Sequence, residues 1–298
     1  MSKVAIVVHG GASIETPDLK NHLSENEAGL KEAIDAGYRV LSRGGTALKA
    51  VEEAVMLLED NPLFNAGRGS CLNKMGEIEM DASIMDGKTL KAGAASMVRS
   101  VKNPIMLART IMVETNHVFL SGYGALEFAK DRFLPLESDA YFVADHQLKE
   151  FQKNTQGNSK KIHGTVGAVA VDRKGNIAAG TSTGGLSRSL PGRIGDSCVI
   201  GAGCYANNKT CAVSGTGDGE YLIRGVVAHT ISMLVSLKKM RLQEACDLVI
   251  HKPNKLIKGE MGVIAINKRG QIAISFNTAI MRRAWKITGE KTQIKIYK

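Results

Sequence analysis

The hydrophobic positions near the start of the chain follow a strand pattern and then a helical one. Residues 3–8 are a mainly apolar run that ends at His9-Gly10-Gly11-Ala12, which predicts a buried strand entering a tight loop. A helix is expected over 25–41, because Gly44-Gly45 follows it as a stop signal. A second helix is expected after Thr46, where apolar residues recur at helical spacing up to Asn61-Pro62.

The pattern then changes to short strands, a helical stretch and a polar segment. Strands are predicted over 77–84 and 90–98 around the turn Asp86-Gly87, and helices over 104–115 and 124–131. From about 135 to 164 the chain is polar and charged and has no period. Such a long segment without periodicity is typical of a flexible linker.

After this linker the strand pattern returns. Two hairpins are predicted, 165–171 with 176–181 and 261–267 with 271–276, together with a strand over 211–213 and helices over 220–237 and 242–250. Strands grouped with strands, and helices in pairs, favour sheets packed on each other over alternating βαβ units. We therefore expect an α+β fold, a four-layer αββα sandwich built from both halves of the chain.

Composition narrows the class of protein. The chain has 298 residues, a net charge of +10 and 5% aromatic residues. The basic residues are scattered, which argues against nucleic-acid binding. No apolar run is long enough to span a membrane, and the N-terminus lacks a secretory pattern, so we expect a cytoplasmic protein. The five cysteines form no C-x-x-C pair and predict neither disulfides nor a zinc site.

The segment that follows the linker carries the first candidate for chemistry. Thr165 opens a predicted strand directly after Gly164. A threonine hydroxyl needs a base, and a free α-amino group on the same residue supplies one because its pKa is about 7.7–8. Breaking the Gly164–Thr165 bond would release that amine. Thr165 alone would be an ordinary strand threonine; its place after a protease-accessible segment makes it a candidate nucleophile.

Other polar residues downstream suit acyl transfer to an amino-acid substrate. Thr183 ends the next strand, so its hydroxyl is expected beside Thr165. Arg193 and Asp196 lie three residues apart in a glycine-rich loop, and such a pair suits the carboxylate and ammonium of an amino acid, or else forms a loop salt bridge. The turn from Ser214 to Glu220 offers backbone N–H groups for an anion, but it lacks a nucleotide fingerprint.

These motifs together resemble the plant-type L-asparaginase and isoaspartyl-dipeptidase family of threonine hydrolases, most closely its human-like subgroup. The resemblance covers nearly the whole chain. It rests on the Thr165 segment and on four further motifs, His9-Gly10-Gly11, Asn61-Pro62-Leu63-Phe64-Asn65-Ala66-Gly67, Glu79-Met80-Asp81-Ala82 and Met85-Asp86-Gly87. It implies one N-terminal-nucleophile hydrolase domain over 1–298, cut into an α subunit (1–164) and a β subunit (165–298).

The resemblance also implies a role for each matching residue. Thr165 would be the nucleophile assisted by Thr183, and Thr216 with Gly217 would form the oxyanion hole. Arg193, Asp196 and Gly219 would bind the substrate, Asn65 would line the site, and His9, Gly10 and Gly11 would influence self-cleavage at Gly164–Thr165. No cofactor is required for the chemistry. A structural sodium ion would be held by the backbone carbonyls of Leu58, Glu59, Asn61, Phe64, Ala66 and Arg68.

The implied reaction is hydrolysis of L-asparagine and of β-aspartyl dipeptides by a homodimer of αβ units, with no nucleic-acid or membrane partner. Asp218 departs from the asparaginase pattern and matches glycosylasparaginases, so hydrolysis of N4-glycosyl-asparagine is one alternative. Two others are an uncut, non-catalytic homologue and an anion- or nucleotide-binding protein that uses Gly215 to Gly219.

Overall fold

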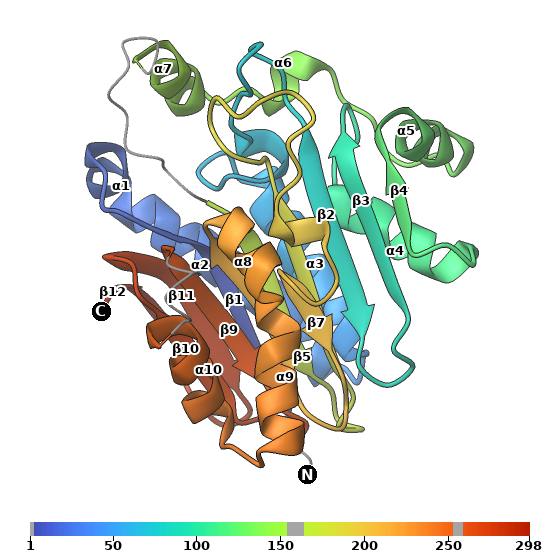
Figure 1. The fold of residues 1–298 in the computed structure, drawn as a ribbon, viewed down its shortest axis with the longest axis vertical. Coiled ribbons are helices and arrows are strands. Elements are labelled where there is room, and N and C mark those ends of the chain that lie inside the picture. The colour runs from blue at the N-terminus through green and yellow to red at the C-terminus, as the bar shows by residue number, and fades with distance from the viewer. Residues whose placement is uncertain (1–2, 154–163, 253–258) are drawn as a thin grey trace.

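The protein is a sandwich of two β-sheets with helices on both outer faces. A computed structural model describes residues 3–153, 164–252 and 259–298. In Figure 1 the layers run from α8–α10 in front, through a smaller and a larger sheet, to α2–α4 behind. The expected αββα architecture is confirmed.

The larger sheet contains strands from both sides of residue 165. In the described ranges it has eight strands in the order β12-β11-β1-β5-β6-β2-β3-β4, antiparallel except for β3 with β4. The strands are Ala5–Ser13 (β1), Met80–Asp86 (β2), Ala92–Val98 (β3), Phe119–Ser121 (β4), Val166–Val171 (β5), Ile177–Thr183 (β6), Ile280–Ile287 (β11) and Gln293–Tyr297 (β12). The central strand β5 is buried on both faces, which explains its continuous run of small and branched apolar residues.

The smaller sheet is antiparallel and has the order β10-β9-β8-β7 in the described part of the chain. Its strands are Cys204–Ala206 (β7), Ala212–Gly217 (β8), Met261–Ile266 (β9) and Ile272–Phe276 (β10). Alternate residues of β1 separate the two faces of the larger sheet. Ala5 and Val7 pack between the sheets, whereas Ile6 and Val8 pack under the helices.

The helices form the outer layers and the top of the molecule. One outer layer has Leu23–Ser42 (α2), Ala47–Asp60 (α3), Pro104–Glu114 (α4) and Gly122–Asp131 (α5), and the other has Gly219–Gly225 (α8), Val227–Leu237 (α9) and Leu242–His251 (α10). The shorter helices are Pro17–Asn21 (α1), Asp139–Phe142 (α6) and Asp145–Lys153 (α7). Thr46 caps α3 by accepting a hydrogen bond from Lys49 N at 3.2 Å, as its sequence position predicts.

Three expectations were wrong in detail. The strand β1 continues through His9-Gly10-Gly11 with a bulge instead of ending in a tight loop. The segment predicted as a linker contains α6 and α7, and its last part, 154–163, lies outside the described residues. The helix predicted over 220–237 is broken at Val226, whose φ is +44°. In addition, no element was predicted beyond residue 276, where the chain forms β11 and β12.

Two further expectations concern disulfides and membrane-spanning segments. All five cysteines are buried and free. None of the described helices has the length and apolar character needed to cross a membrane.

Candidate active site

Thr165 lies at the edge of the inter-sheet core, immediately before β5. Its side chain is buried, and its hydroxyl donates to the hydroxyl of Thr183 with an Oγ1–Oγ1 distance of 3.4 Å. The pairing of β5 with β6 opposes Val166 and Ser182, so Thr165 and Thr183 extend the same hairpin. The expected proximity of these two residues is confirmed.

The carbonyl oxygen of Gly164 is held by two side chains. It accepts a hydrogen bond from Asn65 Nδ2 at 2.8 Å and another from Thr183 Oγ1 at 3.1 Å. The Asn65 side chain is itself oriented, because its Oδ1 accepts the backbone N–H of Cys71 at 2.9 Å. Two donors therefore converge on the oxygen that gains negative charge if the Gly164 carbonyl carbon is attacked.

Glycines allow the chain to pack closely around this peptide bond. Gly11 has a φ of +105°, and a methyl group built on it would lie 3.1 Å from Gly164 Cα and 3.3 Å from Thr165 N. A methyl group on Gly164 would lie 2.9 Å from Asn65 Cβ. A side chain at either glycine would push the cleavage bond out of place. Gly11 therefore packs against the bond, and the influence of the His9-Gly10-Gly11 segment on self-cleavage stays a prediction.

His9 is buried between the sheets and does not line the cavity at Thr165. Its Nε2 lies 2.9 Å from Ser214 Oγ, and that hydroxyl lies 2.7 Å from Thr181 Oγ1. Burial lowers the pKa of His9 to about 3, so the imidazole is neutral at neutral pH. His9 thus connects β1 of the larger sheet to β8 of the smaller one.

Arg193 and Asp196 lie on the opposite side of a small cavity that Thr165, Thr183 and Gly217 also line. Arg193 forms a two-point ion pair with Glu220, at 3.0 and 2.9 Å. The carboxylate of Asp196 is buried, and its Oδ2 has no hydrogen-bond partner among the described residues. Burial raises the pKa of Asp196 to about 7, although the charge of Arg193 acts in the opposite direction. A cation and an unsatisfied carboxyl thus face one cavity.

Gly219 and Gly217 shape this cavity, whereas Thr216 lies deeper. A methyl group on Gly219 would lie 2.8 Å from Arg193 Nη2 and 3.0 Å from Asp196 Oδ1. Gly217 has a φ of +125° and packs against the carbonyl of Glu260. Thr216 is fully buried, and its hydroxyl accepts the N–H of Ala12 at 3.3 Å. The oxyanion role of Thr216 and Gly217 stays a prediction.

Asp218 does not line the cavity at Thr165 in the described structure. It occupies the N-cap position of α8 without a side-chain capping bond, and its Oδ2 accepts the N–H of Glu260 at 2.9 Å. Its backbone N–H donates to the Glu260 carbonyl at 2.7 Å. The departure at this position therefore secures the segment that leads into β9.

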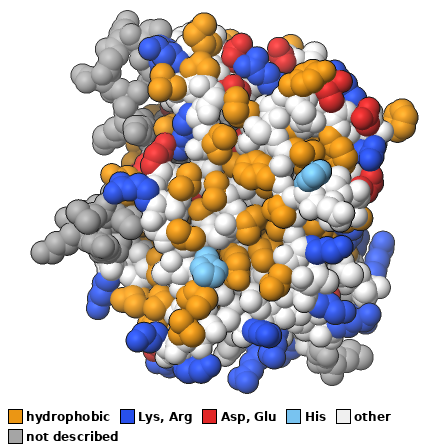
Figure 2. All heavy atoms as spheres, turned by 45° about the vertical axis from the view of Figure 1, so that its right-hand side comes forward, with side chains coloured by type: hydrophobic (Ala, Val, Ile, Leu, Met, Phe, Trp, Pro, Cys, Tyr) orange, Lys and Arg blue, Asp and Glu red, His pale blue; other side chains and the backbone are white. Residues whose placement is uncertain are grey.

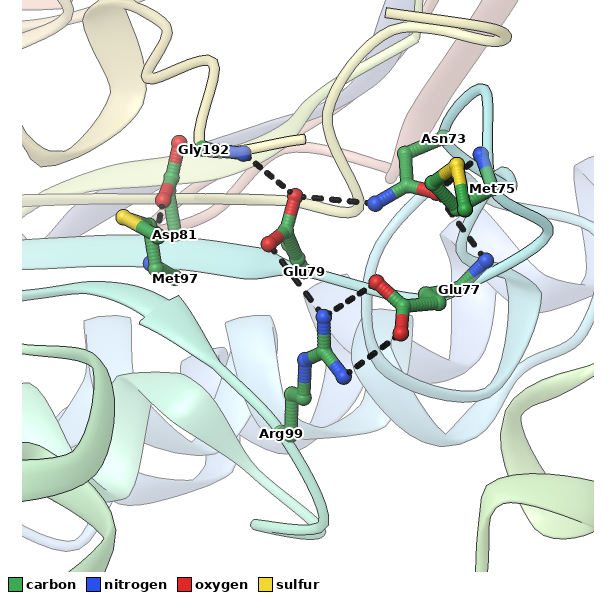
Figure 3. A network of polar contacts seen from close by, with 8 residues as sticks. All are labelled: Asn73, Met75, Glu77, Glu79, Asp81, Met97, Arg99 and Gly192. Atoms are coloured by element: carbon green, nitrogen blue, oxygen red, sulfur yellow. Dashed lines mark hydrogen bonds and ion pairs between the residues drawn. The ribbon is translucent and has the colours of Figure 1, made fainter. Parts of the chain in front are cut away.

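Two carboxylates that precede or begin β2 hold the loop that carries Arg193 and Asp196. Figure 3 shows Glu79 between Gly192 and Arg99, with Asp81 beside it. Glu79 Oε2 accepts the N–H of Gly192 at 2.9 Å, and Asp81 Oδ2 accepts the N–H of Gly195 at 3.2 Å. Sequence analysis assigned these carboxylates no role. Their spacing of two residues places both on one face of a strand, which was the available signal.

Arg282 also approaches the cleavage bond, although the sequence showed it only as part of a basic tail. A methyl group on Gly164 would lie 3.7 Å from its Nη2. Its Nη1 donates to Asn26 Oδ1 and to the carbonyl of Leu63, both at 3.0 Å. Sequence spacing carried no signal for this position, because Arg282 reaches Gly164 only through the pairing of β11 with β1.

The loop after α3 packs closely around two glycines. Methyl groups on Gly67 and Gly69 would lie 2.4 Å from the carbonyl oxygen of Glu59 and 2.1 Å from that of Phe64. The carbonyls of Asn61, Phe64 and Ala66 each accept a backbone hydrogen bond within the loop. No group of acidic, histidine or cysteine side chains that could hold a metal occurs in the described ranges. The six predicted carbonyl ligands, Leu58, Glu59, Asn61, Phe64, Ala66 and Arg68, stay a prediction.

Comparison with known proteins agrees with this geometry. The family model described as asparaginase matches residues 2–296. The isoaspartyl peptidase/L-asparaginase of Xenopus laevis is 43% identical over 99% of this chain and 96% of its own length. The isoaspartyl peptidase of Escherichia coli K12 is 41% identical over 100% and 97%, and the human isoaspartyl peptidase/L-asparaginase is 43% identical over 93% and 91%. The chain belongs to the asparaginase family.

Proposed function

We propose that this protein is a self-cleaving threonine hydrolase that converts L-asparagine to L-aspartate and ammonia and removes β-aspartyl residues from dipeptides. The observation that carries the proposal is the pair of hydrogen bonds from Asn65 and Thr183 to the carbonyl oxygen of Gly164, with the Thr165 hydroxyl alongside. The Xenopus and human relatives, which match 99% and 93% of the chain, are named for these two activities.

Self-cleavage is the first reaction. Thr165 Oγ attacks the carbonyl carbon of Gly164, and Asn65 and Thr183 stabilise the oxygen as it becomes negative. The C–N bond breaks, the nitrogen of Thr165 takes a proton, and Gly164 is left as an ester on Thr165 Oγ. Water hydrolyses this ester, so that Gly164 ends in a carboxylate and Thr165 begins with a free amine.

That amine makes the second reaction possible. It accepts the hydroxyl proton of Thr165, since its pKa of about 7.7–8 suits neutral pH. Arg193 binds the substrate α-carboxylate and Asp196 binds the α-ammonium, while Thr165 attacks the side-chain amide and Thr216 with Gly217 receives the oxyanion. Ammonia or an amino acid leaves, and water releases aspartate. The residues carry out the chemistry without a cofactor.

A sodium ion in the loop after α3 would have a structural role. Its charge would hold the backbone carbonyls together, and the same loop carries Asn65 to its position beside Gly164. We propose that this loop, rather than the reacting atoms, is what the ion stabilises.

The test of the function is the change Thr165→Ala. The native protein should give fragments 1–164 and 165–298 by mass spectrometry and release ammonia from asparagine. The variant should remain one chain of 31.9 kDa and be inactive. Thr210→Ala is the matched control, because Thr210 is buried and bonded to Ser232 away from Gly164. Cutting that persists in Thr165→Ala would refute the proposal.

We also propose that two αβ units associate. The surface in Figure 2 carries hydrophobic side chains that gather over one face. Leu190, Ile194 and Val226 are among the large apolar residues that are exposed, and exposed apolar patches are typical of association surfaces. Analytical ultracentrifugation should give the mass of two chains. We propose the cytoplasm as the compartment, because all five cysteines are free.

A further inference from the structure

Arg282 is a cation placed beside the cleavage bond without a counter-ion. No carboxylate lies within ion-pair distance of it in the described structure, and its Nε is buried without a hydrogen-bond partner. Its Nη1 is occupied by Asn26 and Leu63, whereas Nη2 points to Gly11 and Gly164. The guanidinium rests on the ring of Phe64, with 5.1 Å between Cζ and the ring centroid. A charge left in this state is unfavourable.

The surroundings leave space for an anion. Arg282, Asn26 and Gly164 line a cavity of about 430 Å³ on the side of Gly164 away from Arg193. Asp18, on α1, attracts the charge of Arg282 from a distance. The two side chains form no ion pair in the described structure, where Asp18 pairs with His22. Burial lowers the pKa of His9 and of His146, and the positive charge of Arg282 lowers both further. Arg282 and Gly164 line this cavity together with three carboxylates and two lysines, Glu15, Asp18, Glu150, Lys149 and Lys153.

Self-cleavage creates the missing anion at this place. Water adds across the Gly164–Thr165 amide, the C–N bond breaks, and Gly164 becomes a carboxylate while its proton goes to the amine of Thr165. The carbonyl oxygen already uses Asn65 and Thr183 as donors. The added oxygen needs new donors. Arg282 Nη2 lies near Gly164 and has no hydrogen bond in the described structure, and the neighbouring Nε is buried without a partner.

We propose that Arg282 is the binding site for the C-terminal carboxylate that cleavage creates on Gly164. The inference rests on the proposed self-cleavage. Binding there holds the new α-subunit terminus on the side of the larger cavity. It thereby keeps the carboxylate away from the Thr165 amine and from the substrate cavity, which Arg193 and Asp196 line.

Protection of this terminus tests the proposal. Native protein, Arg282→Gln and Arg282→Lys are first shown by mass to be cut into 1–164 and 165–298, and the folded proteins are then treated with a carboxypeptidase. Gly164 should be lost at least about tenfold faster from Arg282→Gln than from the native protein. Arg282→Lys keeps the charge and should fall between them. Equal trimming of native and Arg282→Gln would overturn the proposal.

Arg283→Gln is the matched control. Arg283 is on the same strand, but it donates to the carbonyls of Met281, Ile296 and Tyr297 and has no contact with Gly164 in the described structure. Its removal should leave the trimming rate unchanged. A folded Arg282→Gln chain that never cuts itself would show that the guanidinium acts in the cleavage reaction, before the carboxylate forms. That result would also overturn the proposal.

A crystal structure of the cut native protein gives a second test that does not depend on the variants folding. A carboxylate oxygen of Gly164 should lie within about 3.2 Å of Nε or Nη2 of Arg282. A terminus bound elsewhere, or absent from the density, would overturn the proposal. A native protein that remains one chain would instead refute the self-cleavage itself, so the two failures are distinguishable.

Discussion

At the scale of single residues, Asn65 shows how one side chain can be fixed for one task. Its Oδ1 accepts the N–H of Cys71, so its amide nitrogen must face Gly164 and Gly185, to which it donates at 2.8 Å each. The orientation of the amide is therefore set by the backbone and not by the reacting group. A donor held in this way needs no rearrangement when charge develops on the Gly164 oxygen.

Asn65→Ala should slow self-cleavage by about 100- to 1,000-fold, the cost of removing one donor from an oxyanion. The measurement is the fraction of chain cut over time, read by intact mass. Asn103→Ala is the control. Asn103 is also buried, but it lies just before α4 and donates to Asp60 and Met56 of α3. Equal cleavage rates in the Asn65→Ala variant and the native protein would remove Asn65 from the mechanism.

Residues that act through their own chemistry could be predicted from the sequence, whereas residues that act through contacts could not. Thr165 follows a polar segment and has a glycine before it, and Arg193 with Asp196 suits a substrate with two opposite charges. Arg282 gives no such signal. It reaches Gly164 only because β11 pairs with β1 and β1 pairs with β5, and sequence spacing does not contain those pairings.

At the scale of elements, β2 acts as a support for the substrate loop. Asp81 accepts the N–H of Gly195 through Oδ2 and that of Met97 through Oδ1. Glu79 likewise accepts the N–H of Gly192, as Figure 3 shows. A rigid strand thereby fixes the loop that places Arg193 and Asp196. Leu190 and Ile194 of this loop are exposed, so we expect the polar contacts with Glu79 and Asp81 to fix its position.

Asp81→Asn should raise KM for asparagine by about tenfold and change kcat little, because an amide replaces one of two acceptors with a donor. The control is Glu77→Gln, since Glu77 pairs with Arg99 at the surface and does not bond the loop. A fall in kcat with unchanged KM would contradict a positioning role.

The same variant should change the pH dependence of binding. Asp196 must be ionised to hold an ammonium group, and burial raises its pKa to about 7, with Arg193 lowering it and Asp81 and Glu220 raising it. KM should therefore rise as pH falls below about 7. Removing the charge of Asp81 should move that rise to lower pH, and an unmoved rise would show that Asp196 does not control it.

At the scale of the whole molecule, the two predicted subunits share one sheet. β1 and β2 precede the cleavage site, whereas β5, β6 and β11 follow it. β1 lies between β11 and β5, and β2 pairs with β6, so strands from both sides of the cleavage site are neighbours. The grouping of strands and paired helices predicted the four layers, because each layer needs an apolar face for its neighbour. The sequence did not predict β11 and β12, because the charged residues of β11 do not alternate with apolar ones and the partner strand was not known.

His9 provides the test at this scale, because it joins the two sheets through Ser214. Burial lowers its pKa to about 3 in the folded protein, whereas an unfolded chain has a pKa near 6.5. Between these values the unfolded state binds more protons, so the contribution of His9 is complete above about pH 6.5 and is lost as pH falls. The free energy of unfolding of the native sequence should decline there more steeply than that of His9→Gln.

The comparison is made in the Thr165→Ala background, so that every chain stays uncut. Other groups titrate alike in both chains, and the difference between the slopes of the two curves should approach about 1.4 kcal/mol per pH unit, the value for one proton. Urea unfolding at successive pH values between 4 and 6.5 measures it. His117→Gln, a change at an exposed site, should leave the slope as it is. Parallel curves for native His9 and His9→Gln would mean that His9 binds a proton equally well in the folded and unfolded protein. The neutral hydrogen bond between His9 and Ser214 would then not contribute to the pH dependence of stability.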